Sequence, residues 1–102
     1  MKKKFAFLLM GEHYDPARHC AEFDTEKQIT YICTVKNAEE AYAKAAALKD
    51  AGVGAIELCG AFGEEMARKI IGLTGGEVAV GFVTHFPEQD GVFERFFQRF
   101  NG

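Results

Sequence analysis

Ionisable side chains stand where the apolar runs of this chain end. Glu57 is embedded in the apolar run 54–59, and His13 and His85 follow two other such runs. A carboxylate and an imidazole that converge on one site can exchange protons with a bound molecule. We therefore predict Glu57, His85 and His13 as the candidate catalytic residues. The structural alternative for Glu57 is an ion pair or hydrogen bond, and for each histidine a simple hydrogen bond.

Small and polar residues accompany these three side chains at the ends of the same runs. Ligands of parallel α/β sheets bind outside the carboxyl ends of the strands, so residues at these ends are expected to converge on one edge. The predicted ligand-binding residues are Gly11, Glu12, Thr34, Cys59, Gly60 and Thr84. The ligand they predict is a small polar metabolite, and the sequence names neither a cofactor nor a substrate.

Two other kinds of site are weakly indicated by the sequence. Histidines and cysteines that could ligate a metal are present, but no zinc-binding spacing links them, so no metal site is predicted. They are His13, His19, Cys20, Cys59 and His85. The segment "CGAFGEE" (59–65) has the glycines of a phosphate loop, but it matches neither the Walker nor the dinucleotide fingerprint. Glu64 and Glu65 would also repel phosphate, so a tight strand-to-helix turn is favoured.

The elements that must position these residues follow from apolar runs and helical stripes. Strands are predicted at 4–10, 28–35, 54–59 and 77–85, and helices from 37 to about 51, from 63 to 74 and after Pro87. Alternating strands and helices predict a single α/β domain over 1–102, with a four-stranded, mostly parallel sheet and three helices. The strand order could be flavodoxin-like or sequential, and a ferredoxin-like α+β fold is the alternative.

Local signals refine this arrangement. The run 4–10 is nearly continuous, which is typical of a strand covered on both faces. The run 28–35 alternates, which is typical of an edge strand, and the segment 11–27 is expected to be a long loop. Asn37 and Glu40 form a capping-box pair at the start of one helix, and Gly52 ends that helix.

The last predicted helix carries a stripe of phenylalanines on one side. The stripe consists of Phe93, Phe96, Phe97 and Phe100, with polar residues largely opposite. The stripe is expected to close over the sheet of its own chain, and the alternative is that it buries against a second subunit. A four-stranded sheet with three helices leaves some apolar surface uncovered, so the sequence predicts a homo-oligomer.

Composition excludes several classes of partner. The formal net charge is −3 and the pI about 5.6, which argues against nucleic acid and anionic membranes as partners. No apolar run approaches the length of a membrane span, and the run 5–10 is too short for a secretion signal. The three cysteines are odd in number and form no C-x-x-C motif. A cytoplasmic protein without a disulfide framework is expected.

Two resemblances add to this interpretation. Over nearly its whole length, with "KKKFAFLLMGEHYDP" and "GVGAIELCGAFG", the chain resembles a family of small uncharacterised bacterial proteins, which implies no reaction. Over residues 31 to 84, including "AGVGAIELCGAFG", it is similar to the opening βαβαβ segment of 2-keto-3-deoxy-6-phosphogluconate aldolases, which are TIM barrels. That resemblance places Glu57 on the general acid/base glutamate of those enzymes. Ala61 and Phe62 stand where they have an arginine, and their Schiff-base lysine strand has no counterpart here. The resemblance therefore supports the local geometry and the orientation of Glu57, and not aldolase activity.

Three hypotheses for function follow. The first is binding of a small polar metabolite at the strand ends, with acid–base chemistry by Glu57, His85 and His13. The second is a non-catalytic homo-oligomeric interaction module that uses the phenylalanine-rich helix or an exposed sheet face. The third is a metal or redox sensor that uses Cys59 and the histidines.

Overall fold

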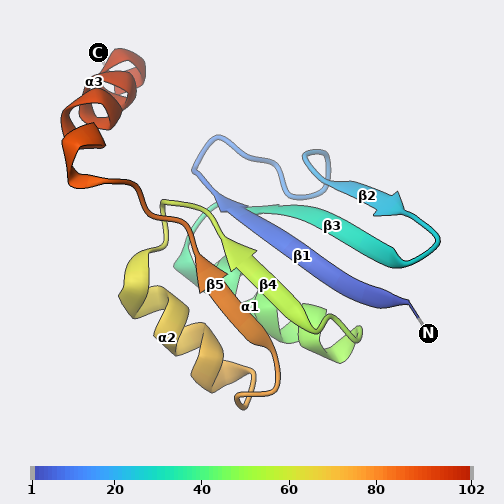
Figure 1. The fold of residues 1–102 in the computed structure, drawn as a ribbon. Coiled ribbons are helices and arrows are strands. Elements are labelled where there is room, and N and C mark those ends of the chain that lie inside the picture. The colour runs from blue at the N-terminus through green and yellow to red at the C-terminus, as the bar shows by residue number, and fades with distance from the viewer. Residues whose placement is uncertain (1, 102) are drawn as a thin grey trace.

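The computed structural model describes residues 2–101 of the chain, and the side chains of residues 2–98. It shows one α/β domain with a mostly parallel five-stranded sheet, as the sequence predicts apart from the strand count (Figure 1). The elements in chain order are β1 (Lys3–Met10), β2 (Ala21–Asp24), β3 (Gln28–Val35), α1 (Ala38–Asp50), β4 (Ala55–Leu58), α2 (Gly63–Leu73), β5 (Ala79–Phe82), the 3₁₀ helix η1 (Pro87–Gln89) and α3 (Asp90–Asn101).

The sheet has the strand order β2-β3-β1-β4-β5. Four strands are parallel to their neighbours, and β2 pairs antiparallel with β3. The order β3-β1-β4-β5 of the parallel strands is the flavodoxin-like order, one of the two predicted. The ferredoxin-like alternative is wrong, because β1 and β3 pair in parallel and not antiparallel.

The additional strand, β2, lies in the segment 11–27 that the sequence predicts to be a loop. Its four residues, "AEFD", are all exposed, and they pair with the middle of β3. A strand this short and this exposed carries too little apolar alternation to be recognised, and its formation depends on the neighbouring edge of β3. β3 is therefore next to the edge of the sheet and not at it.

Helices α1 and α2 contact each other and cover one face of the sheet, which we call the covered face (Figure 1). Ala6 and Leu8 of β1 and Ile56 and Leu58 of β4 point to this face, and each is at most 1% exposed. They form a continuous core with small side chains of the two helices. Burial of this apolar surface is the main contribution to the stability of the fold.

The opposite face has no helix packed on it among the described elements, and we call it the open face. Successive strand residues point to opposite faces, so the strand register assigns its members. They are Phe5, Phe7 and Leu9 of β1, Thr30, Ile32 and Thr34 of β3, Ala55 and Glu57 of β4, and Ala79 and Gly81 of β5. Thr34 is 4% exposed and is bonded to the loop that follows β1. The expectation that β1 is covered on both faces is therefore met on one face only.

The predicted start and end of α1 are confirmed. The Asn37 side chain accepts a hydrogen bond from the backbone N–H of Glu40 at 2.9 Å, and the Glu40 carboxylate accepts one from the N–H of Lys36 at 2.8 Å. These bonds satisfy amides that have no partner inside the helix. Gly52 ends the helix with φ +93°, a conformation that glycine adopts at little cost.

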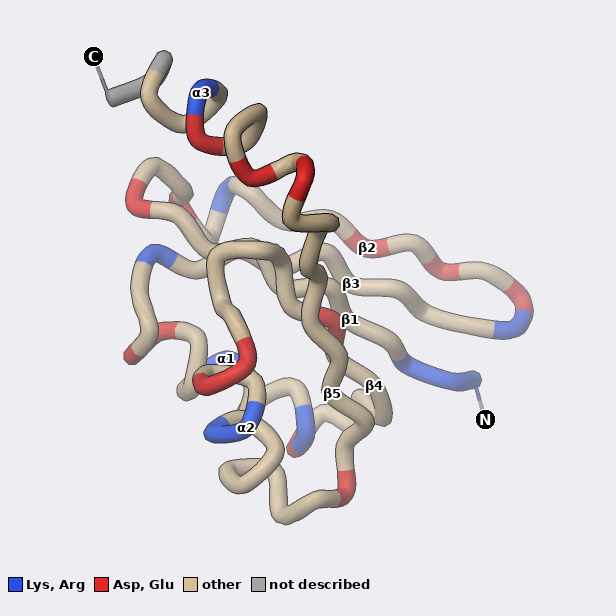
Figure 2. The backbone as a smooth tube through the Cα atoms, turned by 60° about the vertical axis from the view of Figure 1, so that its left-hand side comes forward, with Lys and Arg blue, Asp and Glu red and all other residues tan. Residues whose placement is uncertain are grey.

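Helix α3 projects from the carboxyl ends of the strands and leaves the sheet behind (Figures 1 and 2). Within the described part of the chain, η1 is the element with which it makes substantial contact. The expected phenylalanine stripe is present and exposed at Phe93 and Phe97. The Phe100 side chain lies outside the described residues. The expectation that this helix closes over its own sheet is therefore wrong, because η1 and not the strands is the element that it contacts substantially.

Candidate functional site

The carboxyl ends of the parallel strands lie side by side, as parallel pairing requires. The N–H of Gly11, just after β1, donates a hydrogen bond to the carbonyl oxygen of Val35 at the end of β3, at 3.0 Å. On the other side of β1, the N–H of Met10 donates to the thiol sulfur of Cys59 at 3.4 Å. The parallel ladder between β4 and β5 continues the row. The predicted ligand-binding residues near these ends are therefore held along one edge.

Glu57 lies on the open face, two residues before this edge, between Phe7 of β1 and Gly81 of β5. Its half-buried side chain lies across Gly81: a Cβ atom placed there would be 2.5 and 2.6 Å from the two carboxylate oxygens. Among the described residues, no hydrogen bond or ion pair reaches this carboxylate. Gly81 therefore allows the position of a carboxylate whose acceptor sites are open to a ligand.

His13 lies in the turn that follows β1. Its ring is 4.2 Å from the ring of Tyr14, and a Cβ atom on Gly11 would be 2.7 Å from its Cε1 atom. The missing side chain at Gly11 thus allows the imidazole to lie close to the strand end. His13 and Glu12 are both exposed, so both are accessible to a molecule in solution.

His85 is oriented by the base of α3. Its Nε2 atom is 2.7 Å from Oδ1 of Asp90, and its ring stacks on Phe93 with centroids 4.1 Å apart. Thr84 next to it is exposed. Within residues 2–98, no hydrogen bond joins His85, His13 and Glu57 to one another. The three predicted catalytic side chains share an edge of the sheet, and each is positioned by a different neighbour.

Thr34 and the carboxyl end of β3 border an open depression of about 440 Å³. Its other walls come from Pro16 and Cys20 of the loop after β1 and from α1. The Thr34 hydroxyl donates a hydrogen bond to the carbonyl oxygen of His19 at 2.7 Å, and only 4% of the residue is exposed. Thr34 thus fastens the loop to β3, with its hydroxyl hydrogen already used.

Cys33 in the same depression has a thiol whose pKa is raised, mainly because burial disfavours the charged thiolate. Lys44 opposes this shift, and Cys20 adds to it. The Cys59 thiol accepts the hydrogen bond from Met10 described above. Gly60 is exposed, and a Cβ atom placed there would be 4.0 Å from the carbonyl oxygen of Val83. Gly60 therefore leaves room for a ligand to approach the backbone.

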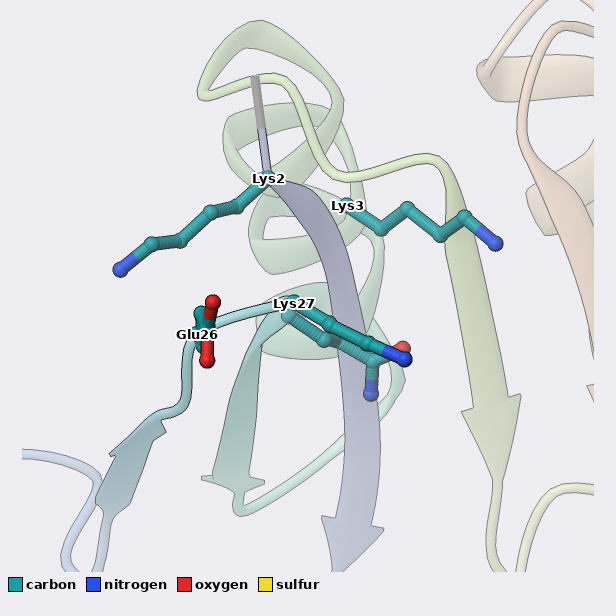
Figure 3. A pocket seen from close by; sticks show the side chains of 5 residues that line it. Lys2, Lys3, Glu26 and Lys27 are labelled. Carbon is teal, nitrogen blue, oxygen red and sulfur yellow. The ribbon is translucent and has the colours of Figure 1, made fainter.

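A second depression, of about 630 Å³, lies at the opposite, amino-terminal edge of β1 and β3 (Figure 3). Figure 3 shows that Lys2 extends to one side of β1, whereas Lys3 and Lys27 extend to the other. The Lys2 ammonium is also paired with Asp24 at 2.6 Å. The lysine side chains do not converge on one point, so this depression is a weak candidate for an anion site.

The described part of the chain has no cluster of metal-ligating side chains. No group of three or more His, Cys, Asp or Glu side chains there could hold a metal ion. His19 instead accepts a hydrogen bond from the backbone N–H of Asp15 through Nδ1, at 2.8 Å. The Cys20 thiol lies 3.8 Å from the carbonyl oxygen of Ala17.

Two residues that shape the site were not predicted. Gly81 lies beneath the Glu57 carboxylate, and an isolated glycine inside an apolar strand run is a recognised sign of a close approach. Asp90 pairs with His85 across a turn whose geometry no local motif indicates. The first could have been found from the sequence, and the second depends on how η1 leads into α3.

Comparisons with known proteins identify one family. The model of a family of unknown function (DUF6506) matches residues 3–98. No curated protein and no solved structure matches the chain. Across the described residues, none of the helices has the length and apolar character that crossing a membrane requires.

Proposed function

The chain belongs to this family of unknown function, and from the geometry of the strand ends we propose that it binds a small polar metabolite there, with Glu57 as the recognising group. The observation that carries the proposal is the half-buried Glu57 carboxylate, which lies across Gly81 without a hydrogen-bonding partner among the described residues. A charged group on an apolar face is costly unless something pairs with it. A bound molecule would supply that partner.

The chemistry of Glu57 limits the class of ligand. An ionised carboxylate accepts hydrogen bonds and cannot donate them. The ligand is therefore a metabolite with an ammonium, amidine or hydroxyl group directed at Glu57. Its apolar part would lie against Phe7, which is next to Glu57 in the strand register.

The exposed residues of the edge supply the remaining contacts in this proposal. Gly60 allows close approach to the backbone, and Gly11 makes room for the imidazole of His13. Glu12 and Thr84 present polar groups at the ends of β1 and β5. Acid–base chemistry would use Glu57 as one partner and His13 or His85 as the other. The pairing of His85 with Asp90 supports a defined ring orientation for that role.

The experiment is a thermal-shift screen of polar metabolites on the wild-type chain beside Glu57→Gln. A molecule that binds only the folded state raises the melting temperature by mass action. The proposal expects at least one metabolite that stabilises wild type and loses its effect in Glu57→Gln. Glu65→Gln is the matched control, because it removes the same charge from an exposed position on α2.

The outcome against the proposal is equally defined. If Glu57→Gln folds and responds to each stabilising metabolite as wild type does, Glu57 is not part of the binding site. A strong loss of stability in Glu57→Gln without any ligand would assign Glu57 a structural role instead.

A homo-oligomeric interaction module is the second candidate function. The observation that favours it is the exposure of large apolar side chains on the projecting helix, such as Phe97 at 58%. Isolated chains rarely expose a continuous apolar patch of this kind unless a partner covers it. A chain that stays monomeric at high concentration would contradict this candidate.

We propose the cytoplasm as the place of this activity. The three cysteines are all free, as is usual in a reducing compartment. A purified chain that needs oxidation for its stability would contradict this placement.

A further inference from the structure

The open face of the sheet lacks a layer that parallel sheets almost always have. Sheets built from parallel strands normally bury both faces beneath helices. Here α1 and α2 lie on the same face, and the opposite face presents Phe5, Phe7 and Ile32, which remain partly exposed. The open face therefore has the composition of a buried surface without its cover.

Helix α3 does not pack on the sheet of its own chain, as far as the described residues show. It has one apolar side, on which Val92, Phe93 and Phe97 are 49%, 41% and 58% exposed. Figure 2 shows the helix standing clear of the sheet, with charged residues on it in both signs. One chain thus carries an uncovered sheet face and an unpacked amphipathic helix.

The total accessible surface shows how much area is left uncovered. The chain exposes 7167 Å², whereas a compact monomer of 11.3 kDa exposes about 5,700 Å². The radius of gyration is 14.5 Å, compared with about 13 Å for a compact domain of this length. A standard interface buries about 800 Å² per partner, which is little more than half of the excess of about 1,400 Å². The excess is therefore sufficient for a stable dimer.

The connection between β5 and α3 directs the helix away from its own sheet. His85 fixes α3 relative to this connection, because it pairs with Asp90 in the first turn of α3 and stacks on Phe93 one turn later. Phe86, between the strand and η1, is 74% exposed. Among the described residues, the substantial contact of α3 is with η1 and not with the strands.

We propose that α3 of each chain packs across the open face of a second copy, so that two copies exchange their last helices. A helix of 12 residues is about 18 Å long, and the face from β3 to β5 is about 14 Å wide. The helix therefore fits the face it would cover. A two-fold arrangement satisfies both uncovered surfaces of both chains at once. This inference rests on the second candidate function, and it adds which two surfaces meet. A helix packed there would cover Glu57, so the exchange and the metabolite site at Glu57 are alternative uses of the open face.

The test places one charge on each of the two surfaces in separate variants. Phe97→Glu disrupts the helix surface, and Ile32→Glu disrupts the open face, with Thr30→Glu as a replacement if Ile32→Glu does not fold. Sedimentation equilibrium should find a wild-type dimer and a dissociation constant raised at least tenfold in each variant. An equimolar mixture of the two variants should dimerise again, because one intact helix then meets one intact sheet face.

The matched control is Gln98→Glu, which adds the same charge to the polar side of α3. It should dimerise like wild type. Circular dichroism should show the same secondary structure in all variants, because the contacts of Phe97 are with neighbouring rings of its own helix.

The alternative arrangements give different results, and each would overturn the proposal. A monomeric wild-type chain would overturn both the oligomer and the exchange, and a radius of gyration near 13 Å would then show that α3 covers its own sheet. A dimer that resists Phe97→Glu or Ile32→Glu would keep the oligomer but place its interface elsewhere. Variants that dissociate but do not dimerise when mixed would exclude helix exchange.

Discussion

The two faces of the sheet are built from the same strands, but helices of the same chain cover only one of them in the part that the structure describes. On the covered face, branched and small side chains such as Leu8 and Ile56 are at most 1% exposed. On the open face, alternate residues of the same strands remain partly exposed, and they include the carboxylate of Glu57. The covered face explains why the chain folds, and the open face is where we place its function.

This difference separates stability from binding within one sheet. A residue on the covered face gains its full burial from α1 and α2, so its loss should destabilise every copy of the fold. A residue on the open face gains burial only from whatever covers that face. Substitutions on neighbouring positions of one strand can therefore compare the two faces directly.

The largest expected effect is on the covered face. Leu8→Ala should lower the free energy of unfolding by about 3 kcal/mol, because it leaves a cavity in a closed core. Leu9→Ala removes the same atoms from the next residue on the open face, and it should cost about 1 kcal/mol in the Phe97→Glu background. Urea unfolding measures both. Equal losses would show that the single chain already buries both faces.

Thiol reactivity should give the next largest contrast. Burial on the covered face raises the pKa of Cys33, so at neutral pH its thiol stays protonated and slow to alkylate. Cys20 is exposed and should react at least tenfold faster, which corresponds to about 1.4 kcal/mol. The rate at Cys33 should rise as the pH increases toward its raised pKa. Mass spectrometry of alkylated peptides measures both rates, and equal rates at neutral pH would contradict the assigned burial.

A smaller effect of opposite sign is expected at Glu57. Glu57→Leu replaces a carboxylate that has no hydrogen-bonding partner among the described residues with an apolar side chain on an apolar face. It should raise the free energy of unfolding by about 1 kcal/mol, as substitutions at functional sites often do. Urea unfolding beside Glu65→Leu on α2 provides the comparison. A loss of more than about 1 kcal/mol would show that Glu57 supports the fold.

The smallest effect on stability is expected at Gly81. In Gly81→Ala, the new methyl group occupies the space of the Glu57 carboxylate, and the flexible glutamate side chain can move aside. The free energy of unfolding should change by less than about 1 kcal/mol, whereas binding of a ligand identified with wild type should weaken at least tenfold. Titration calorimetry measures the binding. Unchanged affinity would show that the position of the carboxylate over Gly81 is unimportant.

The class of the fold and its parallel strands follow from local patterns in the sequence. The runs at 4–10 and 54–59 and the cap at Asn37 are signals contained within a few residues, and each is confirmed. β2 is not predicted because its four exposed residues carry little apolar alternation, although it pairs with β3 across the short turn at 25–27.

The arrangement of the site could be predicted only in part. Parallel strands imply that Gly11 and Cys59 lie along one edge, and the structure places them there. The environment of each side chain depends on packing between distant elements. The pairing of His85 with Asp90 follows from the course of η1 and α3, which has no counterpart in the spacing of the residues.

The most direct test of the contrast between the faces is the molar mass of the wild-type chain in solution, measured by light scattering across a range of concentrations. The account predicts a mass of about twice 11.3 kDa, because the open face is completed by a second copy. A mass of 11.3 kDa that persists at high concentration would contradict it. The open face would then have to be stable in contact with water.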